Sequence, residues 1–417
     1  MREDAMLEGA YRLLSSEHVS LERLIQPHVQ RTAARVRASG KAYAIHDTTG
    51  FTFGGEMRRE GLGTVDGAND QGFRAHVTLA VSADGRREPL GVLAIGTRLR
   101  PRKKEPGHNE ANRWNIGVNV AEAQVERGQL IHVADRESDI YTLISEARQK
   151  GYRFIFRAAQ DRALLTTMEG EVGRLFESAR MRIPEYRVTV PLSPRGSSPQ
   201  PKTRRAFPAR AGRSAELAFA AAAVTLKRPA HLSSNEYPAG VPINVVRVWE
   251  PSPPKGQVAV EWLLLTSEPI ETTDDLKAVI EGYRARWVIE EYFCAVKTGC
   301  GFERRQLESA DSLFNMLAFC LVVAYVMLLM RTLARDDSQP ATEVLSNEQL
   351  ACLRLLSPKR LSATPTIREA LLRIAALGGH IKNNGEPGWR TLSRGWSELQ
   401  GAERMYLLLR TQTSDQS

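Results

Sequence analysis

Three acidic residues in this sequence have the surroundings expected of metal ligands. Asp47 ends the apolar segment AYAIHD (42–47), Asp135 ends LIHVAD (130–135), and Glu290 lies in a helical segment much later in the chain. Both short segments have the pattern of buried strands, and the carboxyl ends of strands in α/β sheets usually carry the chemistry. Carboxylates are the ligands that hard divalent cations prefer. We therefore predict that these three acids hold two Mg²⁺ or Mn²⁺ ions, which polarise a phosphate, activate a water and stabilise a leaving oxygen.

The helical segment around Glu290 carries four side chains that could act on one substrate. Tyr283, Arg286, Glu290 and Lys297 are at offsets 0, 3, 7 and 14. On a regular α-helix these offsets lie within about 60° of one another, so a phenol, a guanidinium, a carboxylate and an ammonium share one face. The alternative is an ordinary solvated face with Arg286 and Glu290 as an ion pair one turn apart, which is the usual interpretation for a single helix.

The segments that must position these residues predict a mixed α/β fold. Hydrophobic periodicity and turn residues mark an alternation of strands and helices. In chain order we expect strands at 42–47, 72–82 and 88–99, a helix at 108–127, a strand at 130–135, a helix at 138–149 and a strand at 153–157.

The charge distribution favours a polyanionic partner. The chain has 57 Lys and Arg against 48 Asp and Glu, a net charge of +9. Residues 182–228 contain ten of the basic residues and only two acids, and 191–205 is rich in Pro and Ser. Alternating segments on both sides predict a β-rich insertion with a basic loop. Basic surfaces of this kind bind phosphates, although the loop could equally be a solvated one without function.

Other features limit the class of protein. The four cysteines are too scattered for a disulfide framework or a CxxC metal site, which indicates a reducing cytoplasm. The N-terminus has no apolar region typical of a secretory signal. Residues 313–330 are apolar and long enough to cross a membrane, but Asn315 interrupts them. We interpret this segment as a buried or subunit-facing helix and expect no membrane association.

Three motifs together resemble those of the DDE transposases of the insertion-sequence-four family. They are HDTTGFTFGG (46–55), VADRESDIYTLI (133–144) and YRARWVIEEYFCAVKTGCGFERRQLES (283–309). The spacing Y-(2)-R-(3)-E-(6)-K is the signature of that family and is met here without departure. The segment SPPKGQVAVEWLLLTSEPI (252–270) looks closest to the Tn-five-type members.

The resemblance implies an RNase H-like catalytic core that a β-rich insertion divides, followed by a C-terminal helical region. It implies that Asp47, Asp135 and Glu290 are the metal-binding triad. Tyr283, Arg286 and Lys297 match positions that hold phosphates around the cut site and its hairpin. Trp262 matches a tryptophan on which a flipped base stacks, an interaction worth about 1–3 kcal/mol; the alternative is a core aromatic residue on a strand. Arg157 matches a basic residue near the same hairpin.

The same resemblance gives an expected domain organisation and function. We expect a DNA transposase that performs metal-dependent strand cleavage, hairpin formation and strand transfer in cut-and-paste transposition, as a homodimer on double-stranded transposon ends and target DNA. It would act in the bacterial cytoplasm, associated with the nucleoid. The expected segments are an N-terminal helical segment (1–40), the first part of the core (41–157), the insertion (158–262), the second part of the core (263–335) and a C-terminal helical dimerisation region (336–417).

One departure from the family leaves other functions open. Members carry a further N-terminal domain that recognises DNA ends, and too few residues precede Met6 for such a domain. We therefore expect that this chain lacks it. A shortened member could inhibit transposition by forming unproductive oligomers, and the third possibility is a nuclease on the same fold.

Overall fold

The computed structural model describes residues 2–414 except 56–57, 66–69, 101–110, 166–172, 193, 195, 197–207, 358 and 382–384. The described chain divides into two compact units. The first unit is formed by Met1–Glu126 with Trp287–Ser417, and the second unit by Arg127–Arg286. Most of the predicted basic loop (191–205) lies outside the described residues.

The first unit contains an antiparallel sheet of three strands. β2 (Gly72–Ser82) pairs with β1 (Ala42–Thr52) on one side and with β3 (Pro89–Arg98) on the other. The predicted turn between β2 and β3 is present, and it contains Gly85 and Arg87 with positive φ angles of 87° and 55°. The strands expected at 72–82 and 88–99 are therefore both present, and the turn between them joins them as an antiparallel pair.

The length of β1 differs from the prediction. We expected the strand to end at Asp47, but β1 continues to Thr52 and Asp47 is paired opposite Val77 in the middle of the strand. The apolar run stops at Asp47, whereas the backbone pairing does not, because β2 supplies partners for the polar residues that follow. The prediction that Asp47 lies at a strand end is wrong.

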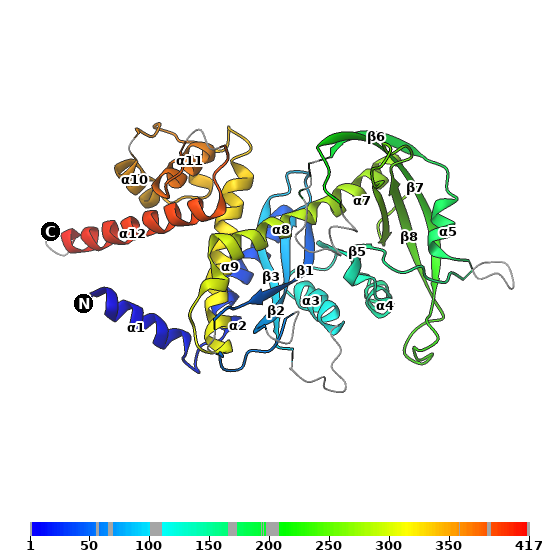
Figure 1. The fold of residues 1–417 in the computed structure, drawn as a ribbon, viewed down its shortest axis with the longest axis horizontal. Coiled ribbons are helices and arrows are strands. Elements are labelled where there is room, and N and C mark those ends of the chain that lie inside the picture. The colour runs from blue at the N-terminus through cyan, green and yellow to red at the C-terminus, as the bar shows by residue number, and fades with distance from the viewer. Residues whose placement is uncertain are drawn as a thin grey trace. The chain divides into compact units, whose positions relative to one another are not determined.

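Two long helices cover β3. α2 (Leu21–Ser39) and α9 (Ala310–Leu333) pack against each other and against this strand (Figure 1). The approach of α2 is close enough to require a glycine, because a Cβ on Gly91 would lie 2.1 Å from the hydroxyl oxygen of Thr32. Gly91 also has a φ of 128°, which side-chain-bearing residues rarely adopt.

The apolar segment 313–330 lies within α9, as a packed helix. By length and composition α9 could cross a membrane, but 67% of its most apolar window is buried inside the protein. Asn315 is itself buried, and its amide nitrogen donates hydrogen bonds to the backbone carbonyls of Leu14 and Val19. The interpretation as a buried helix is supported by this packing.

The remaining helices of the first unit lie at the two ends of the chain and next to the sheet. α1 (Arg2–Leu14) precedes α2, and α3 (Asn112–Glu122) packs on the sheet. At the C-terminal end α12 (Trp389–Ser414) packs on α10 (Asn347–Leu356) and α11 (Ile367–Leu377) (Figure 1). A Cβ on Gly395 would lie 1.7 Å from the carbonyl oxygen of Ile374, so glycine permits the contact between α11 and α12.

The second unit combines a short parallel pair of strands with an antiparallel sheet. β4 (Leu130–Ala134) and β5 (Arg153–Arg157) are parallel. β5 is followed across the sheet by the antiparallel strands β9 (Glu261–Thr266), β8 (Gly240–Trp249), β7 (Arg213–Lys227) and β6 (Tyr186–Leu192). The helices are the single turn η1 (Arg136–Ser138), α4 (Tyr141–Lys150), α5 (Leu175–Arg180) and α7 (Thr273–Ala285).

The order of elements along the chain confirms the predicted fold class. β1, β2, β3, α3, β4, α4 and β5 follow one another as three strands, a helix, a strand, a helix and a strand. This is the mixed α/β order of elements that the sequence predicted. The strands β6 to β8 lie within the segment expected to be the β-rich insertion (158–262), and helices α10 to α12 lie within the expected C-terminal helical region (336–417).

The helix that carries Tyr283, Arg286, Glu290 and Lys297 is interrupted at two places. α7 is capped at Arg286, and α8 (Trp287–Cys294) begins with the next residue. Lys297 lies in a π-helical turn (η2, Ala295–Gly299). The expected uninterrupted α-helix is therefore not present, because Lys297 lies in a wider π turn; that the four side chains share one face stays a prediction.

A buried histidine between α2 and β3 makes the stability of the fold depend on pH. Nε2 of His28 accepts a hydrogen bond of 3.0 Å from the backbone N–H of Val92. Burial, followed by the charges of Arg35 and Arg31, lowers the pKa of His28 from 6.5 to about 4. Because the folded pKa is depressed, the stability due to neutral His28 is complete above pH 6.5 and is lost as the pH falls towards 4.

We predict that His28→Gln flattens this part of the pH dependence. The glutamine amide oxygen can accept the same hydrogen bond without titrating. Between pH 7 and 5 the wild type should lose up to about 2 kcal/mol more unfolding free energy than the variant. Urea unfolding at several pH values measures the difference, and parallel curves for the two proteins would contradict the assignment.

Candidate functional site

The first unit positions Asp47, Glu290 and Lys297 around β1. Oδ1 of Asp47 accepts a hydrogen bond of 2.7 Å from the backbone N–H of Thr48. α8, which carries Glu290 in its first turn, packs against β1. The ammonium nitrogen of Lys297 lies 5.5 Å from the ring centre of Phe51, which is also on β1. Both Glu290 and Lys297 are half-buried. Two carboxylates and an ammonium are thus attached to, or packed on, a single strand.

Thr48 is held by a hydrogen-bond network that involves residues of α3 and β2. Its hydroxyl accepts from Nε of Arg113 at 2.9 Å and lies 2.9 Å from Nδ1 of His76. Burial, with a smaller contribution from Arg113, lowers the pKa of His76 to about 3. The imidazole is therefore neutral and shares one hydrogen bond with the threonine hydroxyl at Nδ1. This chain of donors fixes the backbone that holds the carboxylate of Asp47.

A second histidine continues the network on the other side of Asp47. His46 is fully buried, its Nδ1 lies 3.0 Å from the hydroxyl of Thr78, and its ring is stacked on that of His76 at 5.7 Å. The β1–β2 register places His46 opposite Thr78 and Thr48 opposite His76. Sequence reasoning missed these residues because the pairing depends on the register of two strands. The repeated His–Thr alternation in both strands is the signal that could have found them.

In the second unit Asp135 follows β4 directly, as predicted. It is half-buried and caps the single turn η1, where its Oδ1 accepts a hydrogen bond of 2.9 Å from the backbone N–H of Glu137. The hydroxyl of Ser138 donates to the carbonyl oxygen of Asp135 at 2.6 Å. These bonds hold the carboxylate at the carboxyl end of a strand, the position at which α/β sheets usually carry chemistry.

A buried ion pair fixes the turn that follows Asp135. Asp139 has a side-chain exposure of 1% and pairs with Arg162 at 2.7 Å. Its second oxygen accepts hydrogen bonds of 2.7 Å from the backbone N–H groups of Ala159 and Gln160. The turn after β4 is therefore tied to the loop after β5. Asp139 belongs to the VADRESD motif, but this position makes it a structural acid.

Two of the predicted DNA-binding residues, Trp262 and Tyr283, are in contact. The rings of Trp262 and Tyr283 are 5.4 Å apart at an angle of 62°. Tyr283 is 5% exposed, whereas Trp262 is half-buried at the start of β9. Trp262 is therefore not a fully enclosed core residue. Arg157, at the end of β5, donates a hydrogen bond of 3.3 Å to the carbonyl oxygen of Glu261, and Arg286 is half-buried where α7 ends.

The predicted site residues are distributed over both units. The first unit contains Asp47, Glu290 and Lys297, and the second contains Asp135, Arg157, Trp262, Tyr283 and Arg286. Within the described part of the chain, no group of three or more His, Cys, Asp or Glu side chains is assembled that could hold a metal ion. The metal-binding triad therefore stays a prediction.

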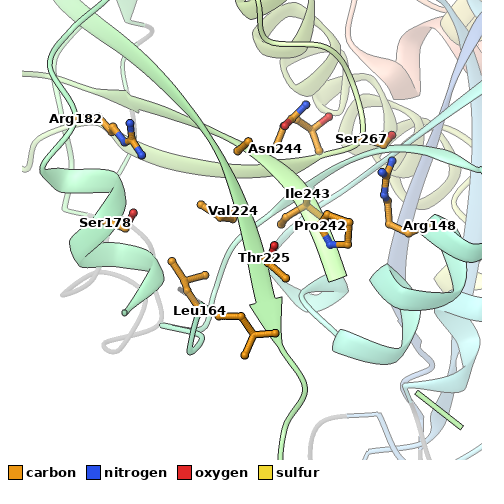
Figure 2. Close-up of a pocket in the computed structure, with 13 residues that line it drawn as sticks. Arg148, Leu164, Ser178, Arg182, Val224, Thr225, Pro242, Ile243, Asn244 and Ser267 are labelled. Carbon is orange, nitrogen blue, oxygen red and sulfur yellow. The ribbon is translucent and has the colours of Figure 1, made fainter. Parts of the chain in front are cut away.

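A sizeable cavity of the second unit does not coincide with the predicted site. A cavity of about 500 Å³ in the second unit lies next to β7 and β8, with Arg148 and Arg182 on opposite sides in Figure 2. Its wall also includes Val224, Thr225 and Ile243, and none of the predicted site residues lines it. A site for an extended polyanion is an open surface, so an enclosed volume is a poor guide to it.

Comparison with known families identifies the segment that contains two of the three acids. Residues 121–327 match the family model described as "Transposase DDE domain". This segment, about half of the chain, is therefore similar to a transposase DDE domain. Asp135 and Glu290 lie inside the matched residues, and Asp47 precedes them.

A solved transposase structure is similar to part of the chain. It is the cryo-EM structure of the piggyBac transposase synaptic complex with hairpin DNA, with a TM-score of 0.35 and 9% sequence identity. The match covers 75% of this chain and 52% of that chain, so the present chain spans about half of its length.

We predict that the hydroxyl of Thr48 stabilises the fold around Asp47. Thr48→Val keeps the shape but removes the acceptor for Arg113 and the donor to His76, which should cost about 1–3 kcal/mol of unfolding free energy. Thr52→Val on the same strand is the matched control, because the side chain of Thr52 is exposed; it should change stability by less than about 0.5 kcal/mol. Equal effects in urea unfolding would show that the network is unimportant.

Proposed function

We propose that this chain is a DNA transposase of the bacterial insertion-sequence-four type, which cuts and joins DNA strands. The observation that carries the proposal is the match of residues 121–327 to the transposase DDE domain, with Asp135 and Glu290 inside it. Asp135 directly follows β4 and Glu290 is in the first turn of α8, so regular elements position both side chains more firmly than a long loop would.

Asp47, Asp135 and Glu290 are proposed as the ligands of two Mg²⁺ or Mn²⁺ ions. The donor set fits these cations, because it consists of carboxylate oxygens without thiolate or imidazole. Backbone N–H groups already orient the carboxylates of Asp47 and Asp135, at 2.7 and 2.9 Å. When bound, the ions would supply Lewis-acid activation of the phosphate and of the attacking oxygen.

The basic and aromatic residues of the site are proposed to hold the DNA. Arg286, Lys297 and Arg157 would bind phosphates near the cut, and the hydroxyl of Tyr283 would donate to another. Trp262 would stack on a base that leaves the duplex when a hairpin forms. The order of reactions would be hydrolysis to release a 3′-hydroxyl, attack of this hydroxyl on the opposite strand, reopening of the hairpin and attack on target DNA.

We propose that the active complex is a homodimer on the nucleoid. Support comes from exposed apolar side chains on the last helix, where Met405, Leu407, Leu408 and Leu409 are 45% to 58% exposed. Such a surface is more apolar than that of most monomers. Sedimentation equilibrium of the purified chain decides between a monomer and a dimer.

The triad is tested by isosteric substitution. Asp47→Asn, Asp135→Asn and Glu290→Gln should each abolish cleavage of double-stranded DNA in Mg²⁺ or Mn²⁺ and leave thermal unfolding unchanged, because each removes a charged metal ligand. Glu291→Gln is the control, since Glu291 is adjacent to Glu290 and pairs with Arg335. A variant that still cuts at the wild-type rate would be excluded from the triad.

Trp262 is tested by separating two steps of the reaction. Trp262→Ala should slow hairpin formation roughly five- to hundredfold, corresponding to the loss of about 1–3 kcal/mol of stacking, and slow the first nick much less. Trp262→Phe retains a ring for stacking and for contact with Tyr283, and should recover most of the rate. If the alanine variant loses both steps equally, Trp262 has a packing role.

A further inference from the structure

Four arginines of the second unit converge on a small cavity, and among them only Arg157 was predicted to bind DNA. The cavity has a volume of about 110 Å³ and is lined by Arg136, Arg157, Arg180 and Arg247 with a single acid, Glu261. We refer to these residues as the arginine pocket. One water occupies about 30 Å³ in the liquid, so a group larger than water can enter. The remaining wall is formed by Ala158, Phe176, Ala179 and Leu263.

The guanidinium groups are held in place by β8, β9 and their own neighbours. Arg247 donates to a carboxylate oxygen of Glu261 at 3.0 Å and lies 4.3 Å from the ring centre of Trp249. Arg180 is 3.7 Å from the other oxygen of Glu261. Arg157 donates to the carbonyl oxygen of the same residue. An ordered scaffold therefore presents the arginines, which lowers the entropic cost of binding a ligand.

The charges in the pocket are not balanced by the protein. Four guanidinium groups face one carboxylate, so three positive charges lack an opposing charge among the lining residues. Guanidinium groups form paired hydrogen bonds with phosphate oxygens, so an anion with several oxygens is the ligand that suits this arrangement.

The pocket lies next to the predicted catalytic acid and on a different face from the stacking tryptophan. Arg136 follows Asp135 in the chain and interacts electrostatically with Asp135, Tyr283 and Arg157. Along β9, Glu261 and Leu263 line the pocket, so Trp262 between them points to the opposite face of the strand. A DNA strand at Asp135 can therefore reach the pocket without competing for the surface around Trp262.

We propose that the arginine pocket binds one backbone phosphate of the DNA, next to the strand held at Asp135. This inference rests on the proposed function, because it assumes that DNA lies at Asp135. It assigns Arg180 and Arg247 to DNA binding. The ligand is a phosphate within a DNA strand, and a site for free inorganic phosphate is the competing outcome of the test.

The test uses the full chain and binding alone. Fluorescence anisotropy of a labelled duplex is measured in EDTA over a range of NaCl concentrations, so cleavage does not contribute and the result is independent of the triad. Arg180→Gln is the informative variant, because Arg180 is 60% exposed and its loss should not disturb the fold. Arg187→Gln is the matched control: Arg187 is 55% exposed, pairs with Glu216 and does not line the pocket.

The expected result is specific to the pocket. Arg180→Gln should reduce the slope of log K against log salt by about 1 and weaken binding about fivefold at 0.15 M salt, because one phosphate contact is lost. Arg187→Gln should leave both unchanged. Glu261→Gln should tighten binding, because it removes the only opposing charge; a purely structural carboxylate would instead lower the melting temperature and leave binding unchanged or weaker.

Two outcomes would overturn the proposal. Equal effects of Arg180→Gln and Arg187→Gln would mean that the positive charge acts diffusely. A second outcome is that Arg180→Gln leaves DNA binding unchanged, while inorganic phosphate raises the melting temperature of the wild type but not that of Arg180→Gln. The pocket would then be a site for a free anion. If DNA is bound as expected but never cut, the catalytic proposal fails and the phosphate pocket does not.

Discussion

A carboxylate that is buried must be paired, and Asp139 shows how much of the second unit follows from that constraint. Its two oxygens bind the guanidinium of Arg162 and the backbone N–H groups after β5, all at 2.7 Å. Removing one partner would leave a buried charge uncompensated, a cost of several kcal/mol. The turn that begins at Asp135 and the chain that leaves β5 at Arg157 are consequently held as one piece, and both the acid and the arginine pocket are attached to it.

In the first unit the buried polar groups that must be paired are neutral. Thr48, His76, His46 and Thr78 are buried or half-buried partners across two paired strands. Burial lowers the pKa of His76 to about 3, so the ring stays neutral and shares a hydrogen bond with the hydroxyl of Thr48. The network holds the strand rigid where Asp47 leaves it. A carboxylate that must serve a metal ion benefits from such support, since a shift of about 1 Å can cost a large part of the activity.

A DNA-processing site needs both acidic and basic side chains, and their opposite charges give them different roles. Acids that bind metal ions repel phosphates, whereas arginines attract them. In the second unit Asp135 and the arginine pocket are adjacent. Arg136 follows Asp135 in the chain, lines the pocket and feels the charges of both Asp135 and Arg157. Trp262 and Tyr283 occupy the opposite face of β9 and supply apolar contact instead. Under the proposed function, phosphate binding and base stacking would therefore use different surfaces of one strand.

The sequence by itself determined the α/β class, the strands around Asp135 and the turn between β2 and β3, because these depend on local periodicity and on turn residues. The tertiary structure decided where the remaining features lie. β1 extends past Asp47 because β2 offers backbone partners, and the helix at Arg286 and Lys297 deviates from regular geometry. His76 meets Thr48, and Arg180 meets Arg247, over long stretches of chain. Such contacts are set by strand register and by the packing of distant segments, which no local pattern records.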